Sequence, residues 1–303
     1  MIDLVVIVYK AELEFLKIQA KSLHLYFSTH LINNIYIIVN DENCLIEDIK
    51  LNWWRDLASK VKILHYSYLS DQPTSMHGWD SQQLLKILTA SISNCEYSLV
   101  LDAKTWFVKS VQFTDFFDNN GRFNCTLMPL FTEFQSSKNF LSDFFQIEFN
   151  SFIGPGGVPF AFHSDTVRKM IEFIEGKTNL KFDKFFSQNV IFPNCVTEFT
   201  LYSAFVLSNK LFTTLYSGYA KFQVTNIADF EYKEINQLLQ TMKSSLNLTS
   251  SIHKNTYKLM NNDQFESWCN FLTEKKLFVS PKIAQMQLNT FKLGVDNGTR
   301  IRF

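Results

Sequence analysis

The sequence lacks the features that mark several common protein classes. Its five cysteines are scattered and none stands in a CxxC spacing, which argues against a disulfide framework and a zinc site. No apolar stretch approaches the ~18 residues that a membrane-spanning helix needs, and the opening MIDLVVIVYK has neither the basic flank nor the length of a signal peptide. Because 29 basic side chains balance 29 acidic ones, no overall field attracts nucleic acid. We therefore expect a cytoplasmic protein that binds no nucleic acid and contacts a membrane at most peripherally.

Several signatures of nucleotide-binding and hydrolytic enzymes are also missing. The segment after the first apolar run, YKAELEF, contains no GxGxxG, so a dinucleotide-binding Rossmann enzyme is not expected. It also lacks the glycine-rich loop of a sugar-phosphate nucleotidyltransferase. There is no P-loop, no GxSxG elbow and no HExxH helix.

Apolar runs alternate with segments of helical periodicity along the chain. The runs at 4–8, 35–39, 61–64 and 97–101 are typical of strands buried on both faces of a sheet. Such alternation predicts an α/β fold with a mostly parallel sheet flanked by helices. We expect Asp80 and Asp165 to act as helix N-caps. The expected helices cover residues 12–26, 81–91, 139–149, 165–174, 198–207 and 265–275.

Asp102 is the first candidate for chemistry, since it directly follows the apolar run 97–101. Ligands of open α/β sheets bind outside the carboxyl ends of the strands. A carboxylate there can hold Mg²⁺ or Mn²⁺, which bridges phosphate oxygens and stabilises a leaving group. The same position also suits an Asp that only caps a helix.

Four segments then carry a resemblance to a known family. In chain order they are GWDSQQLLK (78–86), YSLVLDAK (97–104), VPFAFHSDTV (158–167) and TEFTLYSAF (197–205). Together they resemble bacterial GT-A-type glycosyltransferase-like proteins of polysaccharide gene clusters, over most of the chain as far as SIHKN (251–255). The resemblance implies a Rossmann-like GT-A fold in a single domain over 1–303. It implies a nucleotide-binding half at about 1–110, an acceptor and catalytic half at 111–260, and a C-terminal helical extension at 261–303.

The resemblance also implies an activity and its partners. The protein would move a sugar from a nucleotide-sugar donor to a saccharide or polyprenyl-linked glycan acceptor in cell-surface polysaccharide synthesis, in contact at most with the inner membrane. Lys275 with Lys276, and Arg300 with Arg302, are candidates for such contact, although short charge pairs usually face solvent. A non-catalytic scaffold or glycan-binding subunit of an assembly complex is the alternative.

The roles implied for single residues fall into three groups. Tyr9 and Lys10 would lie beside the nucleotide base, and Gln83 and Lys86 would face the donor. Asp102 takes the place of the first Asp of the family's DxD motif. Glu198 takes the place of the catalytic base of inverting members, although a Glu there can also simply complement the helix dipole, and a retaining enzyme needs no such base. His253 matches a late histidine that completes a metal shell.

Lys104 departs from the family pattern, because it stands where the second Asp of DxD belongs. A protonated lysine cannot ligate a cation. Two possibilities follow: Asp102, His253 and the diphosphate hold Mn²⁺ or Mg²⁺, which is the version we expect, or the Lys104 ammonium neutralises the diphosphate and no metal is needed.

Other features have a plain structural interpretation beside the functional one. The only Gly/Pro cluster, 154–160, either shapes the site or is a bare turn. His163 and Asp165 are candidates for sugar contact, but Asp165 is expected to cap a helix. Trp53, Trp79 and Trp106 can stack on sugars, yet we expect them in the core.

Overall fold

The computed structural model describes residues 1–41, 45–154, 158–227, 235–244 and 247–293. Within these residues the central sheet has five strands in the order β3-β2-β1-β4-β8. β1 pairs in parallel with β2 and β4, β2 pairs in parallel with β3, and β8 is antiparallel to β4. The predicted α/β class with a mostly parallel, helix-flanked sheet is confirmed. The strand bounds are β1 (Ile2–Val8), β2 (Ile32–Val39), β3 (Val61–His65), β4 (Tyr97–Asp102) and β8 (Phe160–His163).

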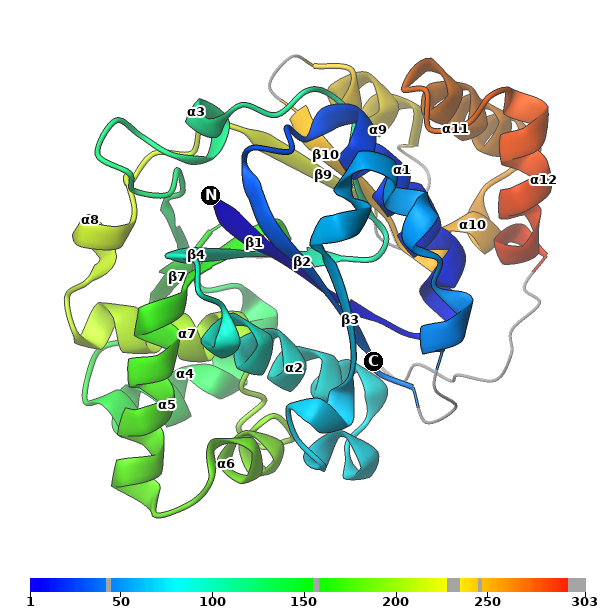
Figure 1. Ribbon diagram of the computed structural model, residues 1–303. Helices are drawn as coiled ribbons and strands as arrows, with labels where there is room; N and C mark the ends of the chain where they lie inside the picture. The colour runs from blue at the N-terminus through cyan, green and yellow to red at the C-terminus, as the bar shows by residue number, and fades with distance from the viewer. Residues whose placement is uncertain (42–44, 155–157, 228–234, 245–246, 294–303) are drawn as a thin grey trace.

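Helices cover both faces of this sheet. All seven residues of β1 are buried, which explains why the strand reads as a continuous aliphatic run. Helices α2, α4, α5, α6 and α7 gather on one side, and α1 with the C-terminal helices lies on the other (Figure 1). The bounds of the helices are α1 (Leu13–Tyr26), α2 (Gly78–Ile92), α3 (Phe113–Phe116), α4 (Gln135–Phe145), α5 (Ser164–Thr178), α6 (Phe182–Asn189), α7 (Glu198–Ser208), α8 (Phe212–Leu215), α9 (Ile235–Met242), α10 (Lys254–Leu259), α11 (Asn262–Glu274) and α12 (Pro281–Lys292).

Short segments of 3₁₀ helix connect several of these elements. They are η1 (Lys10–Glu12), η2 (Ile46–Asp48), η3 (Leu51–Lys60), η4 (Tyr66–Tyr68), η5 (Gln72–Ser75) and η6 (Thr132–Phe134).

A second sheet begins immediately after the central one. β5 (Thr105–Phe107) follows β4 after a two-residue turn, and β10 (Asn247–Ile252) pairs with it in antiparallel register. β9 (Gln223–Ile227) runs parallel to β10. Because β10 is antiparallel to β5, the end of β10 lies beside the start of β5 and thus beside the turn that follows Asp102. A separate pair is formed by β6 (Leu127–Pro129) and β7 (Ser151–Ile153).

Two predicted helix caps are wrong. α2 begins at Gly78, and the imidazole Nδ1 of His77 accepts the cap hydrogen bond from the Trp79 N–H at 3.3 Å. His163 likewise caps α5 and accepts from the Thr166 N–H at 3.3 Å. Asp80 and Asp165 instead lie in the first turns, where a negative charge still complements the helix dipole.

Other predicted boundaries shift by a few residues, and some predictions fall on residues that are not described. The helix expected at 139–149 is α4, which begins and ends four residues earlier, because Gln146 takes a left-handed conformation (φ 55°) that ends it. Positions 155–157 of the Gly/Pro cluster, and both Arg300 and Arg302, lie outside the described residues. Among the helices that the structure describes, none combines the length and apolarity needed to cross a membrane.

Candidate functional site

Four parallel strands of the central sheet end at one edge. Val8 pairs with Val39, Ile7 with Asp102 and Val39 with His65, so the carboxyl ends of β1, β2, β3 and β4 meet there. At the adjoining ends of β1, β2 and β4 stand Tyr9, Asn40 and Asp102. The strand order reverses at β1, with β2 on one side and β4 on the other, and a crevice at such a switch point is the usual ligand site of open α/β sheets.

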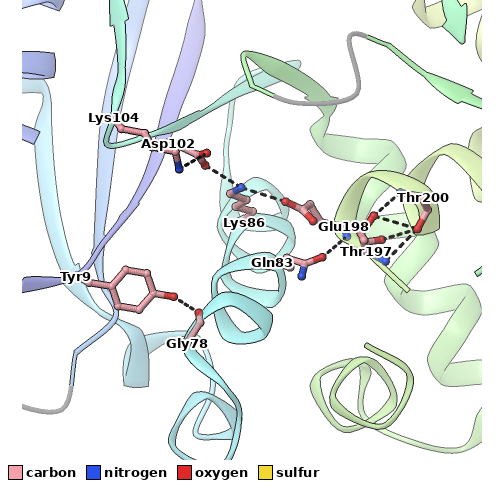
Figure 2. A network of polar contacts seen from close by, with 9 residues as sticks. All are labelled: Tyr9, Gly78, Gln83, Lys86, Asp102, Lys104, Thr197, Glu198 and Thr200. Carbon is pink, nitrogen blue, oxygen red and sulfur yellow. Dashed lines mark hydrogen bonds and ion pairs between the residues drawn. The ribbon is translucent and has the colours of Figure 1, made fainter. Parts of the chain in front are cut away.

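Tyr9 ties the end of β1 to the start of α2. Its hydroxyl donates to the Gly78 carbonyl oxygen (Figure 2). The same hydroxyl accepts a 2.9 Å hydrogen bond from Asn40 Nδ2. Asn40 also donates to Ser81 Oγ at 2.8 Å. Burial raises the pKa of Tyr9, and the charge of Glu12 adds to the rise, so the phenol stays neutral and remains a donor.

Asp102 at the end of β4 contacts two lysines. Its Oδ2 accepts from Lys104 Nζ at 3.0 Å, and its Oδ1 forms an ion pair with Lys86 Nζ, also at 3.0 Å. The side chain of Asp102 is 18% exposed and that of Lys104 17%, so the pair is partly buried at the sheet edge and still reaches solvent. Burial alone raises the pKa of Asp102, but Lys104 and Lys86 together lower it well below its usual range. Asp102 is therefore ionised at neutral pH.

The backbone around Asp102 is fixed from the opposite face of the sheet. Gln19 of α1 donates from Nε2 to the carbonyl oxygens of Asp102, at 2.6 Å, and of Thr105, at 2.9 Å. One buried amide thus clamps both ends of the turn that carries Lys104. This contact holds the carboxylate and the ammonium in one fixed geometry.

Lys86 links the sheet edge to α7. Its ammonium lies 3.0 Å from Asp102 Oδ1 and 3.0 Å from Glu198 Oε1, and the side chains of Lys86 and Glu198 are only 6% and 4% exposed. Burial raises the pKa of Glu198, and the Lys86 charge opposes this rise only in part. Glu198 is the first residue of α7, after the N-cap Thr197, whose hydroxyl accepts from the Thr200 N–H at 3.1 Å. Glu198 is thus a buried group, not a surface charge at a helix end.

Gln83 lies one turn before Lys86 on α2. Its Oε1 accepts from the backbone N–H of Glu198 at 3.4 Å, and the residue is 2% exposed. Its Nε2 has no hydrogen-bond partner among the described residues. Figure 2 shows Gln83 and Lys86 both directed from α2 toward Glu198. A buried amide donor with no partner is costly in a folded protein.

Lys10 and His253 lie at the margin of this network. Lys10 is exposed at the start of η1, and its backbone N–H donates to Asp41 Oδ2 at 3.2 Å. His253 follows β10 and caps α10, with Nδ1 accepting from the Asn255 N–H at 3.4 Å. By the β10–β5 register His253 follows the strand end beside the Asp102–Lys104 turn.

The residues expected to hold a metal do not form a ready cation site. Within the described ranges no group of three or more His, Cys, Asp and Glu side chains is placed to hold an ion. Both carboxylate oxygens of Asp102 already lie against ammonium groups, and a hard cation needs such oxygens as ligands. As they lie, Asp102 and His253 therefore do not fit the expected Mn²⁺ or Mg²⁺.

The other candidates lie elsewhere or belong to the core. His163 pairs with Tyr97 at the opposite end of β4 from Asp102. Trp106 is fully buried, as predicted, but Trp79 is 55% exposed at the start of α2, because only the part of that helix beyond its first turn packs inside. A hollow of about 460 Å³ between α11 and α12 contains none of the predicted site residues.

Sequence reasoning missed the residues that support the site. Gln19 and Asn40 bond to the candidate residues Asp102 and Tyr9 from other parts of the chain, and Thr197 caps the helix that begins at Glu198. Asn40 carried a usable signal, because a polar residue directly after an apolar strand run is a site candidate in an α/β sheet. Gln19 gave none, since a polar residue on a helix normally faces solvent.

Comparisons with known proteins give a family but no characterised function. Residues 4–235 match the profile of a family described as a family of unknown function (DUF6492). The chain belongs to this family. Among curated proteins, none matches this DUF6492 member.

Solved structures with some similarity to this DUF6492 member include two glycosyltransferases. One is the galactosyltransferase LgtC in complex with donor and acceptor sugar analogues, at 9% identity and a TM-score of 0.44, with 83% of this chain and 87% of that chain covered. The other is mouse xyloside xylosyltransferase 1 in its apo form, at 11% identity and a TM-score of 0.45, with 84% and 99% covered.

Proposed function

We propose that this DUF6492 member is a glycosyltransferase that moves a sugar from a nucleotide-sugar donor to a saccharide or lipid-linked glycan acceptor, in cell-surface polysaccharide synthesis. The observation that carries the proposal is the position of Lys86. Its ammonium bridges Asp102, at the sheet edge where α/β proteins bind ligands, and Glu198, at the start of a helix. The carboxylate at the ligand-binding edge and a candidate base are thereby joined by one ammonium group.

The donor half of the site is assigned to the strand ends. The nucleotide base would lie beside Tyr9 and Lys10, where the hydrogen bond from Asn40 holds the phenol in place. The diphosphate would lie against Lys86 and Lys104, with Gln83 Nε2 as a further donor. Residues 1–110 would thus supply most donor contacts and residues 111–260 the acceptor side, within one domain followed by a helical extension.

The reaction proposed is a direct displacement at the anomeric carbon. The acceptor hydroxyl oxygen forms the new bond, the bond to the diphosphate oxygen breaks, and its electron pair leaves with the nucleoside diphosphate. Glu198 takes the hydroxyl proton, and such help from a general base is typically worth ~10²–10⁴ in rate. Burial raises the pKa of Glu198, which makes its carboxylate a stronger base than an exposed one. A general base at Glu198 implies that the configuration of the anomeric carbon is inverted, because a retaining enzyme needs no such base.

The test is turnover by the purified full chain. Nucleotide sugars are presented singly with glycan acceptors, and mass spectrometry follows both the released nucleoside diphosphate and the extended acceptor. We expect one donor to be consumed and its nucleoside diphosphate to raise the melting temperature, as any ligand selective for the folded state does. If no nucleotide or nucleotide sugar shifts the melting temperature and no acceptor is extended, the chain is not a glycosyltransferase and the scaffold alternative applies.

A further inference from the structure

The groups around Asp102 differ in how many of their hydrogen-bond donors and acceptors are already in use. Each carboxylate oxygen lies 3.0 Å from an ammonium nitrogen. Lys104 has three N–H donors, of which the described contacts use one. Gln83 Nε2 adds a buried donor without a described partner. Lys104 therefore keeps N–H donors that can bind an anion, whereas each oxygen of Asp102 already faces an ammonium group.

The two ammonium groups beside Asp102 also restrict what its carboxylate can bind. Two ammonium groups, Lys86 and Lys104, balance two carboxylates, Asp102 and Glu198, and Glu12 adds negative charge near Lys104. A divalent cation at Asp102 would have to displace both ammonium groups from its oxygens. A diphosphate needs no such displacement, because the unused N–H donors of Lys104 can bind it while Asp102 holds the ammonium in place.

We infer that the leaving diphosphate is bound and neutralised by Lys104 and Lys86 in place of a divalent cation, with Asp102 as the residue that positions both ammonium groups. The inference rests on the proposed function and deepens it. In the transfer step the bond between the anomeric carbon and the diphosphate oxygen breaks, and the electron pair stays on that oxygen. Fixed ammonium groups stabilise the negative charge that develops there. The inferred step uses no metal ion.

Lys104 occupies the position that decides whether a divalent cation or an ammonium group neutralises the diphosphate. It lies on the short turn between β4 and β5, clamped by Gln19 on either side. Its side chain is 17% exposed, so a ligand can reach it from solvent, whereas Lys86 is 6% exposed and faces the interior of the cluster. Replacing Lys104 by aspartate would leave two carboxylates on one turn, near the end of β10 that carries His253.

The experiment measures nucleoside diphosphate binding by calorimetry, with UDP and GDP as probes, in EDTA and in Mn²⁺. For the wild type we expect equal affinity in the two buffers and no heat from Mn²⁺ alone. Lys104→Met should weaken binding about ten- to a hundredfold in both buffers, the usual effect of losing a charge-assisted hydrogen bond. Lys104→Arg, which keeps the charge, should retain most of the binding, and Lys169→Met on the exposed face of α5 is the matched control. Lys104→Asp should bind poorly in EDTA and recover in Mn²⁺.

The outcomes separate this inference from the proposed function. If the wild type binds nucleoside diphosphate and transfers sugar only in Mn²⁺, the glycosyltransferase assignment stands and the lysine mechanism is overturned. If the Lys104→Met and Lys169→Met variants bind equally well, the lysine has no part in diphosphate binding and the inference is also overturned. If the wild type binds no nucleotide and transfers no sugar in either buffer, both fail together. Circular dichroism of each variant establishes that it is folded.

Discussion

The ammonium of Lys86 lies 3.0 Å from Oε1 of Glu198, so α2 and α7 share an ion pair that is almost closed to solvent. The two residues are 112 positions apart in the sequence. Such a contact stabilises little by itself, because desolvation of both charges offsets their attraction. Its strict geometry is better explained by a role in the site than by a contribution to stability.

Removing only the lysine should be costly. In Lys86→Met both Asp102 and Glu198 lose a buried counterion, and breaking a buried pair in this way costs about 3–5 kcal/mol in the free energy of unfolding. Urea denaturation measures the change. Lys169→Met, whose side chain is 64% exposed, should stay within about 0.5 kcal/mol of wild type. Equal stability of the two variants would mean that the Lys86 contacts do not form in solution.

Replacing the candidate base should separate catalysis from binding. Glu198→Gln keeps the shape of the side chain but cannot take a proton, so we expect transfer to slow by about 10²–10⁴ while the donor still binds. The control is Glu172→Gln on the exposed face of α5. In the wild type, activity should also fall on acidification at a pH above the ordinary Glu range, because burial raises the pKa of Glu198. A Glu198→Gln enzyme with wild-type kcat would remove this residue from catalysis.

The Asp102–Lys104 pair should add to the free energy of unfolding only within a defined pH range. The folded-state pKa of Asp102 is lowered, so its contribution is present above its unfolded pKa of about 3.9 and is lost as the pH falls through the folded value. The pKa of Lys104 is raised by Asp102 against the effect of burial, so its contribution is present below its unfolded pKa of about 10.4 and is lost as the pH rises through the folded value.

Comparison with Asp102→Asn tests this range. The wild type should exceed the variant in free energy of unfolding between about pH 4 and about pH 10, and the difference should narrow beyond either limit. Urea melts across the pH range provide the measurement. A difference that stays constant from acid to alkali would show that the pair is not ionised in the folded protein.

Two tryptophans near the site should differ strongly in how much their replacement by alanine lowers the free energy of unfolding. Trp106 is fully buried against Phe15 and Trp268, so Trp106→Ala should cost about 3–5 kcal/mol. Trp79 is 55% exposed, and Trp79→Ala should change the free energy of unfolding by less than about 0.5 kcal/mol. Thermal and urea denaturation compare them directly. A large loss for Trp79→Ala would place that ring in the core, where the sequence first suggested it.

The four parallel strands of the central sheet were predicted because their signal is local, whereas the short antiparallel strand β8 was not. β1, for example, is buried on both faces, and its residues Leu4 to Val8 therefore appear as an aliphatic run. The second sheet gave no such signal. β5 has only three residues, and β10, with the sequence NLTSSI, is polar although every residue in it is buried. Asn247 of this strand is held by a tertiary contact, since Thr225 Oγ1 donates to Asn247 Oδ1 at 2.7 Å.

The sequence by itself determined the α/β class, the position of Asp102 at a strand end and the lysine that follows it, because alternating patterns and strand ends depend on neighbouring residues alone. Only the tertiary structure decided that Lys86, Lys104 and Glu198 form one cluster around Asp102. These contacts join α2, the β4–β5 turn and α7, and the packing of distant elements cannot be read from local periodicity. The same packing decided the charge balance of the site, since an ammonium group binds a carboxylate only when the fold brings the two together.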